Sequence, residues 1–106
     1  MNITEETKGN WTCLALTERL DTATAPELQK AGLKVLETTN SLALDFSQLA
    51  YISSAGLRVL LILGKKAKAD GGSLVFCGAC GMVKDILEES GMEAFFTSYG
   101  SAAELP

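Results

Sequence analysis

The chain has 106 residues, 47% of them hydrophobic and 21% charged, which suits one globular domain over residues 1–106 and excludes a disordered chain. Nine basic residues against thirteen acidic ones give a formal net charge of −4. Nucleic acid is therefore not expected as a partner, because its phosphates need a basic surface. The sequence contains no histidine, which excludes Ser-His-Asp and Cys-His catalysis and histidine-ligated metal sites.

The N-terminal residues and the apolar runs indicate in which compartment of the cell the chain is expected. Residues 1–6 contain no basic stretch followed by an apolar one, so no signal peptide is expected. The longest strongly apolar run, residues 59–63, is far shorter than the roughly 20 residues that a membrane-spanning helix needs, so no membrane insertion is expected. The three cysteines are interpreted as reduced thiols, which predicts a cytoplasmic location.

The first part of the chain predicts a β-hairpin followed by a helix. Strands are expected over residues 3–7 and 11–17, joined by a turn over 8–10. A loop over 20–23 precedes a helix that starts near Thr24, because Thr24 suits an N-cap and Glu27 completes a capping box. The apolar face of this helix is formed by Leu28, Ala31, Val35 and Leu36.

The remainder alternates strands and helices. Strands are expected over 42–46, 73–77 and 94–98, helices over 54–69 and 81–90, and a short helix over 102–105. Residues 47–52 are expected to form a loop, and Met82, Ile86 and Leu87 to face inward. This order predicts a single α/β domain, in which a small mixed, mostly parallel sheet with an N-terminal hairpin is packed by three to four helices.

Two segments stand out: LDTATAPEL over residues 20–28 and LDFSQLAYISSAGLRVL over residues 44–60. They resemble the signature of STAS domains, in particular of bacterial anti-sigma factor antagonists. The resemblance covers essentially the whole chain in length and element order, and it implies a STAS-type fold.

The resemblance implies a regulatory binding protein that is not an enzyme and needs no cofactor. In that family the unphosphorylated protein binds an anti-sigma factor that is a serine kinase, and the sigma factor is released. The kinase then phosphorylates a serine, the complex dissociates, and a serine phosphatase restores it. In the motif this serine falls on Ser54, two residues before Gly56. Ser53 stands where well-known members carry Asp and is a second candidate acceptor, while Arg58 stands where they carry Gly.

A partner-binding surface is therefore predicted around the start of the second helix. A phosphate on a serine there would face free backbone N–H groups and the positive end of the helix dipole. The alternative is that Ser53 and Ser54 only cap the helix. Asp45 is expected to cap the loop before Ser54. The predicted surface comprises Asp21, Thr22, Asp45, Ser53, Ser54, Ala55, Gly56, Leu57, Arg58 and Ile62.

The second helix has two predicted sides. At 100° per residue, the side expected to face the core carries Leu57, Leu60, Leu61, Gly64 and Ala67. The other side carries Arg58, Val59, Ile62, Lys65 and Lys66. Its two apolar residues indicate either a docking surface or a flank covered by the third helix or a second copy of the chain.

The sequence is also compatible with two other functions. One is a soluble STAS subunit that regulates a membrane transporter. The other is a thiol oxidoreductase using Cys77 and Cys80, whose C-x-x-C motif falls between a strand and a helix, where the helix N-terminus lowers a thiol pKa. Against it, the only prolines are Pro26 and Pro106, so no cis-proline loop can face the thiols. No metal site is expected, because one C-x-x-C supplies only half of a zinc shell.

Overall fold

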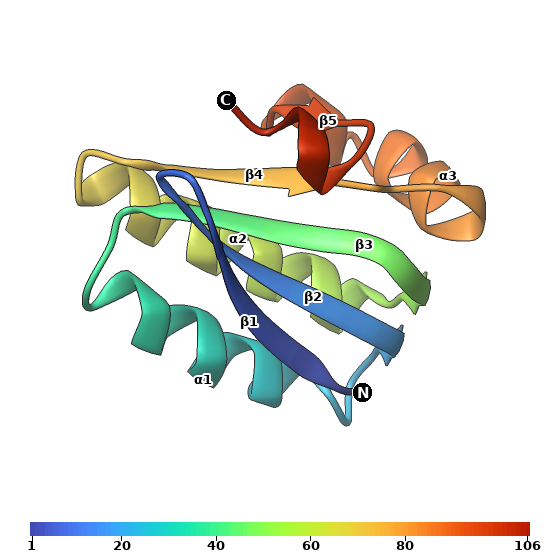
Figure 1. Ribbon diagram of the computed structural model, residues 1–106. Helices are drawn as coiled ribbons and strands as arrows, with labels where there is room; N and C mark the ends of the chain where they lie inside the picture. The colour runs from blue at the N-terminus through green and yellow to red at the C-terminus, as the bar shows by residue number, and fades with distance from the viewer.

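The computed structural model describes residues 1–106 and contains one five-stranded sheet with the strands in chain order (Figure 1). β1 (Ile3–Lys8) and β2 (Trp11–Leu20) form an antiparallel hairpin. β3 (Ser41–Ile52), β4 (Ser73–Cys77) and β5 (Ser98–Tyr99) each run parallel to the preceding strand. The predicted α/β class and the mixed, mostly parallel sheet are confirmed.

Three helices connect the parallel strands. α1 (Ala25–Leu36) follows β2, α2 (Ser54–Ala69) follows β3, and α3 (Gly81–Glu89) follows β4. Two short 3-10 helices, η1 (Met92–Ala94) and η2 (Ala102–Glu104), flank β5. α1 and α2 lie side by side on one face of the sheet (Figure 1). None of the helices has the length and apolar character required to cross a bilayer.

The two faces of the sheet bury very different amounts of apolar surface. The face under α1 and α2 belongs to a core of 21 buried residues, whereas the opposite face holds a cluster of only four, Cys13, Ala43, Val75 and Cys77. Side chains alternate between the two faces along each strand, as strand geometry requires. The small cluster is covered by Trp11, Tyr99, Ala102 and Leu105, and the Trp11 indole Nε1 donates a hydrogen bond to the Pro106 carbonyl oxygen at 3.0 Å.

The predicted loop over 47–52 is wrong, because β3 continues as a strand to Ile52. Its partner β2 also continues beyond the expected end, up to the pair Leu20 and Ile52. The pairing shifts register between Ala15 and Thr17 and again between Glu18 and Arg19, and Glu18 has a φ of 67°. Such bulges interrupt the apolar alternation by which a strand is predicted, so the sequence pattern resembles a loop.

Three smaller expectations are also corrected. Thr24 makes no capping hydrogen bond to α1, so the predicted capping box is absent. In α3 the buried residues are Val83 and Leu87, while Met82 is 59% exposed. The last strand is confined to Ser98–Tyr99, because the chain forms η1 over Met92–Ala94 after a left-handed turn at Gly91, whose φ is 77°.

Candidate functional site

The two segments that carry the family signature meet at the carboxyl ends of β2 and β3. Leu20 and Ile52 are the last paired residues of these strands, and the Ser53 N–H donates to the Leu20 carbonyl oxygen at 2.8 Å. The chain enters the loop at Asp21 after one strand and α2 at Ser54 after the other. Parallel pairing therefore brings the Asp21 loop beside the N-terminus of α2, where ligands of parallel sheets bind.

The two serines at the start of α2 have different roles. Ser53 is the N-cap, with extended backbone, and its side-chain oxygen accepts a hydrogen bond from the Gly56 N–H at 3.3 Å. Ser54 is the first helical residue, its side chain is exposed, and its hydroxyl takes part in no hydrogen bond. No acidic side chain occupies the first turn of α2. An anion at Ser54 would therefore meet the positive end of the helix dipole without a competing carboxylate nearby on the helix.

Gly56 allows the first turn of α2 to lie directly against the end of β2. A Cβ at position 56 would lie 2.7 Å from the Leu20 Cγ and 3.0 Å from the Leu20 carbonyl oxygen. Ala55 and Leu57 are half-buried and pack against the main core. These three predicted surface residues therefore hold the helix start in place, and Ser54 is the residue of this turn with the most exposed side chain.

The loop after β2 is held by its own side chains. The Asp21 Oδ1 accepts hydrogen bonds from the N–H groups of Ala23 and Thr24 at 3.0 and 3.2 Å. The Thr24 hydroxyl accepts from the Asp21 N–H and donates to the Arg19 carbonyl oxygen, so it is engaged in the loop and is not free to cap α1. The hydrogen bonds from Thr24, and then those from Ala23, lower the pKa of Asp21 below its ordinary value. Thr22 is exposed within this fixed loop.

A cation–aromatic pair beside this loop was not predicted. The Arg19 guanidinium lies over the Tyr51 ring, 4.4 Å from its centroid, and its Nε is 3.7 Å from the Asp21 Oδ2. Arg19 and Tyr51 are paired residues of β2 and β3, on the far side of the second register shift. Because the shift sets this pairing, no local sequence pattern predicts it.

The outward side of α2 differs from the prediction at one position. Arg58 is exposed and Ile62 is half-buried, as expected for that side, but Val59 is only 5% exposed and belongs to the core. Leu63, one turn after Val59 on the same flank, packs against Gly32 of α1, so this flank of the helix is covered. α1 approaches so closely that a Cβ at Gly32 would lie 2.6 Å from the Leu63 Cδ1. The buried arc of α2 is formed by Gly56, Val59, Leu60, Leu63 and Ala67.

Asp45 lies apart from the other predicted residues. Its Oδ1 accepts the Ser47 N–H at 2.9 Å, within β3, and its strand partners are Ala15 and Cys77. The segment that leads to Ser54 is a strand and not the predicted loop, but Asp45 does accept the backbone N–H of its first residue, Ser47. Asp45 also lies beside the thiols of Cys13 and Cys77.

The C-x-x-C cysteines do not have the environments of a reactive pair. Cys77 is fully buried, its thiol donates to the Leu44 carbonyl oxygen at 3.7 Å, and its pKa is raised by the neighbouring Cys13 thiol and by burial. Cys80 is exposed at the N-cap of α3, without a capping hydrogen bond. A thiol oxidoreductase requires an accessible thiol with a lowered pKa at the first cysteine, so this arrangement argues against that function.

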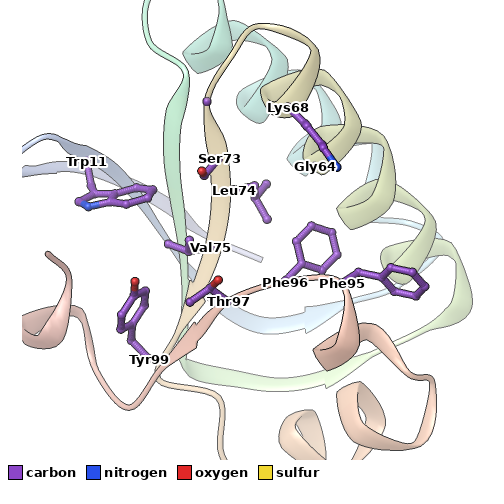
Figure 2. A pocket seen from close by; sticks show the side chains of 11 residues that line it. Trp11, Gly64, Lys68, Ser73, Leu74, Val75, Phe95, Phe96, Thr97 and Tyr99 are labelled. Carbon is purple, nitrogen blue, oxygen red and sulfur yellow. The ribbon is translucent and has the colours of Figure 1, made fainter.

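Ser54 and the Asp21 loop line none of the five main cavities of the molecule. A cavity of about 370 Å³ lies at the edge of β4, between Trp11 and Tyr99 on one side of the strand and Phe96 on the other (Figure 2). Its lining includes no residue of the Asp21 loop or the first turn of α2. Small-molecule sites are usually concave, so an exposed helix start beside a fixed loop is better suited to a protein partner.

These features match a known family. A STAS domain profile matches residues 2–105, and the chain therefore belongs to the STAS domain family. One relative, a candidate anti-sigma factor antagonist named BtrV from Bordetella bronchiseptica, is 35% identical over 79 residues. The match spans 74% of this chain and 62% of that protein, so it covers less than two thirds of the relative's length.

Solved structures share the fold at low identity. A candidate anti-sigma factor antagonist from Thermotoga maritima has a TM-score of 0.89 and 17% identity, over 96% of this chain and 89% of that one. The Bacillus cell fate determinant SpoIIAA in its phosphorylated form has a TM-score of 0.74 and 13% identity, over 97% of this chain and 95% of that one. At these identities the likeness shows a common STAS fold.

Proposed function

We propose that this chain is an anti-sigma factor antagonist, a regulatory binding protein switched by phosphorylation of Ser54. In this proposal the unphosphorylated form binds an anti-sigma factor that is a serine kinase, in the cytoplasm, and the sigma factor is released. The chain is the substrate of that kinase, and a serine phosphatase reverses the modification. The observation that carries the proposal is the exposed, unbonded Ser54 hydroxyl at the start of a 16-residue helix. The name of the Bordetella relative supports the same role.

The hydrogen bonds favour Ser54 over Ser53 as the phosphorylated residue. The Ser53 side-chain oxygen accepts the Gly56 N–H, so modification there would remove the N-cap of α2. Modification of Ser54 breaks no hydrogen bond and places a dianion beside the free N–H groups of the first turn. The helix can therefore carry the phosphate without unfolding.

The proposed partner surface is smaller than the predicted one. It consists of the Asp21 and Thr22 loop together with Ser54, Arg58 and Ile62. Arg58 lies one helical turn after Ser54 and is exposed, so its guanidinium can donate charge-assisted hydrogen bonds to a phosphate there. A partly exposed pair of this kind contributes only about 1 kcal/mol. The half-buried Ile62 supplies an apolar contact one turn further on.

Site mapping tests the modified residue. The chain is incubated with ATP and its cognate kinase, and the product is analysed by mass spectrometry. Ser54→Ala should abolish modification, whereas Ser53→Ala should still be modified although its free energy of unfolding falls by about 1 kcal/mol, the usual cost of losing a cap. Modification that persists in Ser54→Ala, or is confined to Ser53, would reject the assignment.

Calorimetry tests the switch. Ser54→Ala should bind the kinase about as well as the unmodified chain, and Ser54→Asp should bind more weakly by on the order of 2 kcal/mol, because its charge is buried unpaired in the interface. Adding Arg58→Ala should alter the difference in kinase affinity between Ser54→Ala and Ser54→Asp without unfolding the chain. Equal affinities for Ser54→Ala and Ser54→Asp would exclude a switch based on charge.

A further inference from the structure

We propose that Cys13, Asp45 and Cys77 form a binding site for a thiophilic divalent cation of the zinc type. The two thiol sulfurs and a carboxylate oxygen of Asp45 all lie within 4.8 Å of one another. The three residues belong to the adjacent strands β2, β3 and β4, on the face of the sheet opposite α1 and α2. The site is distinct from the Ser54 surface and does not depend on the proposed function.

The spacing of the sulfurs fits one ion between them. Zinc binds thiolate sulfur at about 2.3 Å, so two thiolates on one ion lie at most about 4.6 Å apart. The present spacing is within 4.8 Å, so small side-chain movements suffice to close the shell. The third ligand, a carboxylate oxygen, binds zinc at about 2.0–2.2 Å and is already within the same distance of both sulfurs.

A disulfide does not fit the same pair. Cys13 is paired with Ala43 of β3, and Cys77 is paired with Asp45 of the same strand, so β3 separates the two cysteines. Two strands with a third strand between them are roughly 9.5 Å apart, whereas the Cα atoms of a disulfide are at most about 6.8 Å apart. Joining the sulfurs directly would require the sheet to deform, while an ion can bridge them with the strands in place.

The carboxylate is oriented toward the thiols. The Asp45 Oδ1 accepts the Ser47 N–H at 2.9 Å, and Oδ2 makes no hydrogen bond. Gly78, with a φ of 72°, leaves room for this carboxylate, since a Cβ there would lie 2.8 Å from the Asp45 Oδ1. One oxygen is thus held by the backbone and the other is free for an ion, an arrangement typical of outer hydrogen bonds that orient metal ligands.

The surroundings and the donor set indicate the class of ion. Cys13 and Cys77 are 2% and 0% exposed, beneath a cover that includes Trp11 and Tyr99, and Figure 2 shows these two rings with Val75 on the same side of β4. Two thiolates with one carboxylate suit zinc, whereas magnesium and calcium take oxygen ligands. Three protein ligands leave a fourth position for water. Binding releases the two thiol protons to the buffer.

A cobalt titration tests the site. The reduced, metal-free 106-residue chain is titrated with Co²⁺, and thiolate-to-cobalt charge-transfer absorption is recorded before displacement with Zn²⁺. Saturation is expected at one equivalent. Cys13→Ser and Cys77→Ser should each lose the band at equimolar Co²⁺, while the matched control Cys80→Ser keeps it. Asp45→Asn, which retains the acceptor for the Ser47 N–H, should keep the band and require more Co²⁺.

A second measurement needs no variant in the buried cluster. Zn²⁺ should raise the melting temperature of the unaltered chain when an equal concentration of Mg²⁺ does not, because binding to the folded state alone stabilises it. Zn²⁺ should also slow alkylation of Cys13 and Cys77, but not of Cys80, as resolved by peptide mass spectrometry. The proposal is overturned by an unaltered chain without a charge-transfer band, by a band that survives Cys13→Ser in a folded variant, or by one that depends on Cys80.

Discussion

At the scale of single residues, neighbouring residues at the N-terminus of α2 have different structural roles. Ser53 caps the helix, Ser54 presents a free hydroxyl, and Gly56 lets the helix approach Leu20. The conformation of this turn is set by backbone contacts around Ser54 and not by Ser54 itself. Chemical modification of the exposed hydroxyl can therefore change the surface without disturbing what holds it.

Replacing Gly56 by Ala should lower the free energy of unfolding by about 1–3 kcal/mol, the range for overpacking a well-packed site. The added Cβ would lie 2.7 Å from the Leu20 Cγ and 3.0 Å from a carbonyl oxygen that cannot move freely within the sheet. Urea unfolding measures the change. Ser54→Ala, at the exposed position two residues earlier, is the matched control and should stay within about 0.5 kcal/mol of the parent chain. A Gly56→Ala variant as stable as the parent would contradict the proposed close packing.

Asp21 should make stability depend on pH in the acid range. Its pKa is lowered in the folded chain, chiefly by the Thr24 hydrogen bonds, so its ionised form contributes stability above the ordinary value of 3.8. This contribution is lost as the pH falls through the lower folded value. Asp21→Asn keeps the oxygen acceptor and removes the charge. The free energy of unfolding of Asp21→Asn should lie below that of the parent chain by a constant amount near neutral pH. This difference should shrink below pH 3.8, as measured by urea unfolding at each pH. A deficit that does not change with pH would show that the charge has no such role.

At the scale of elements, α2 has a narrow buried arc and a broad outer surface. α1 covers the flank with Val59, and Phe96 lies close against Gly64 on another side, where a Cβ would be 2.4 Å from the Phe96 ring. Ile62 is half-buried between the covered flank and the lysines. On α2, the partner surface that we propose is the strip that runs from Ser54 through Arg58 to Ile62.

Paired aspartate substitutions on α2 test this orientation. Val59→Asp should destabilise the chain by more than about 3 kcal/mol, because it buries an unpaired carboxylate in the core. Ile62→Asp should cost less than about 1 kcal/mol and abolish binding of the kinase. Thermal unfolding and calorimetry on both variants give the comparison. If Ile62→Asp unfolds the chain as readily as Val59→Asp does, Ile62 belongs to the core and the strip is misassigned.

At the scale of the whole molecule, the sheet has one heavily covered face and one lightly covered face. The second face depends on a few contacts from the far end of the chain, among them Leu105 and the Trp11–Pro106 hydrogen bond. These contacts connect the C-terminal segment to the β-hairpin. The cover isolates the Cys13 and Cys77 thiols from solvent, whereas the main core is a separate cluster under the helices.

Deleting residues 101–106 should expose the thiols of the second face and leave the helical core folded. Cys13 and Cys77 should then react with a thiol reagent about tenfold faster or more, because an opening that costs 1.4 kcal/mol less is about ten times more frequent. Cys80, already exposed, serves as the internal reference. Circular dichroism checks the fold. Unchanged rates at Cys13 and Cys77 would show that other contacts keep them covered.

The amino-acid sequence by itself determined the features that depend on local signals. The predicted bounds of α2 (Ser54–Ala69) and β4 (Ser73–Cys77) coincide with the observed ones, since a serine cap, a Gly-Gly stop and a short apolar run mark their ends. The βαβ order followed from the alternation of such segments. The spacing of the family motif pointed to Ser54, and Ser53 stayed a second candidate because it stands where well-known members carry Asp.

Tertiary structure decided whatever depends on a second element. Two register shifts in the β2–β3 pairing allow β3 to stay paired up to Ile52, so Asp45 lies inside a long strand and not at the end of a short one. Packing of α1 against α2 buries Val59, and the Gly56 N–H bond assigns the cap to Ser53. Asp45 lies 32 residues after Cys13, and Cys77 lies 32 residues after Asp45. Only the register of the strands brings these three side chains together. Pairing across strands depends on bulges and on non-local packing energies, which no local pattern of residue types records.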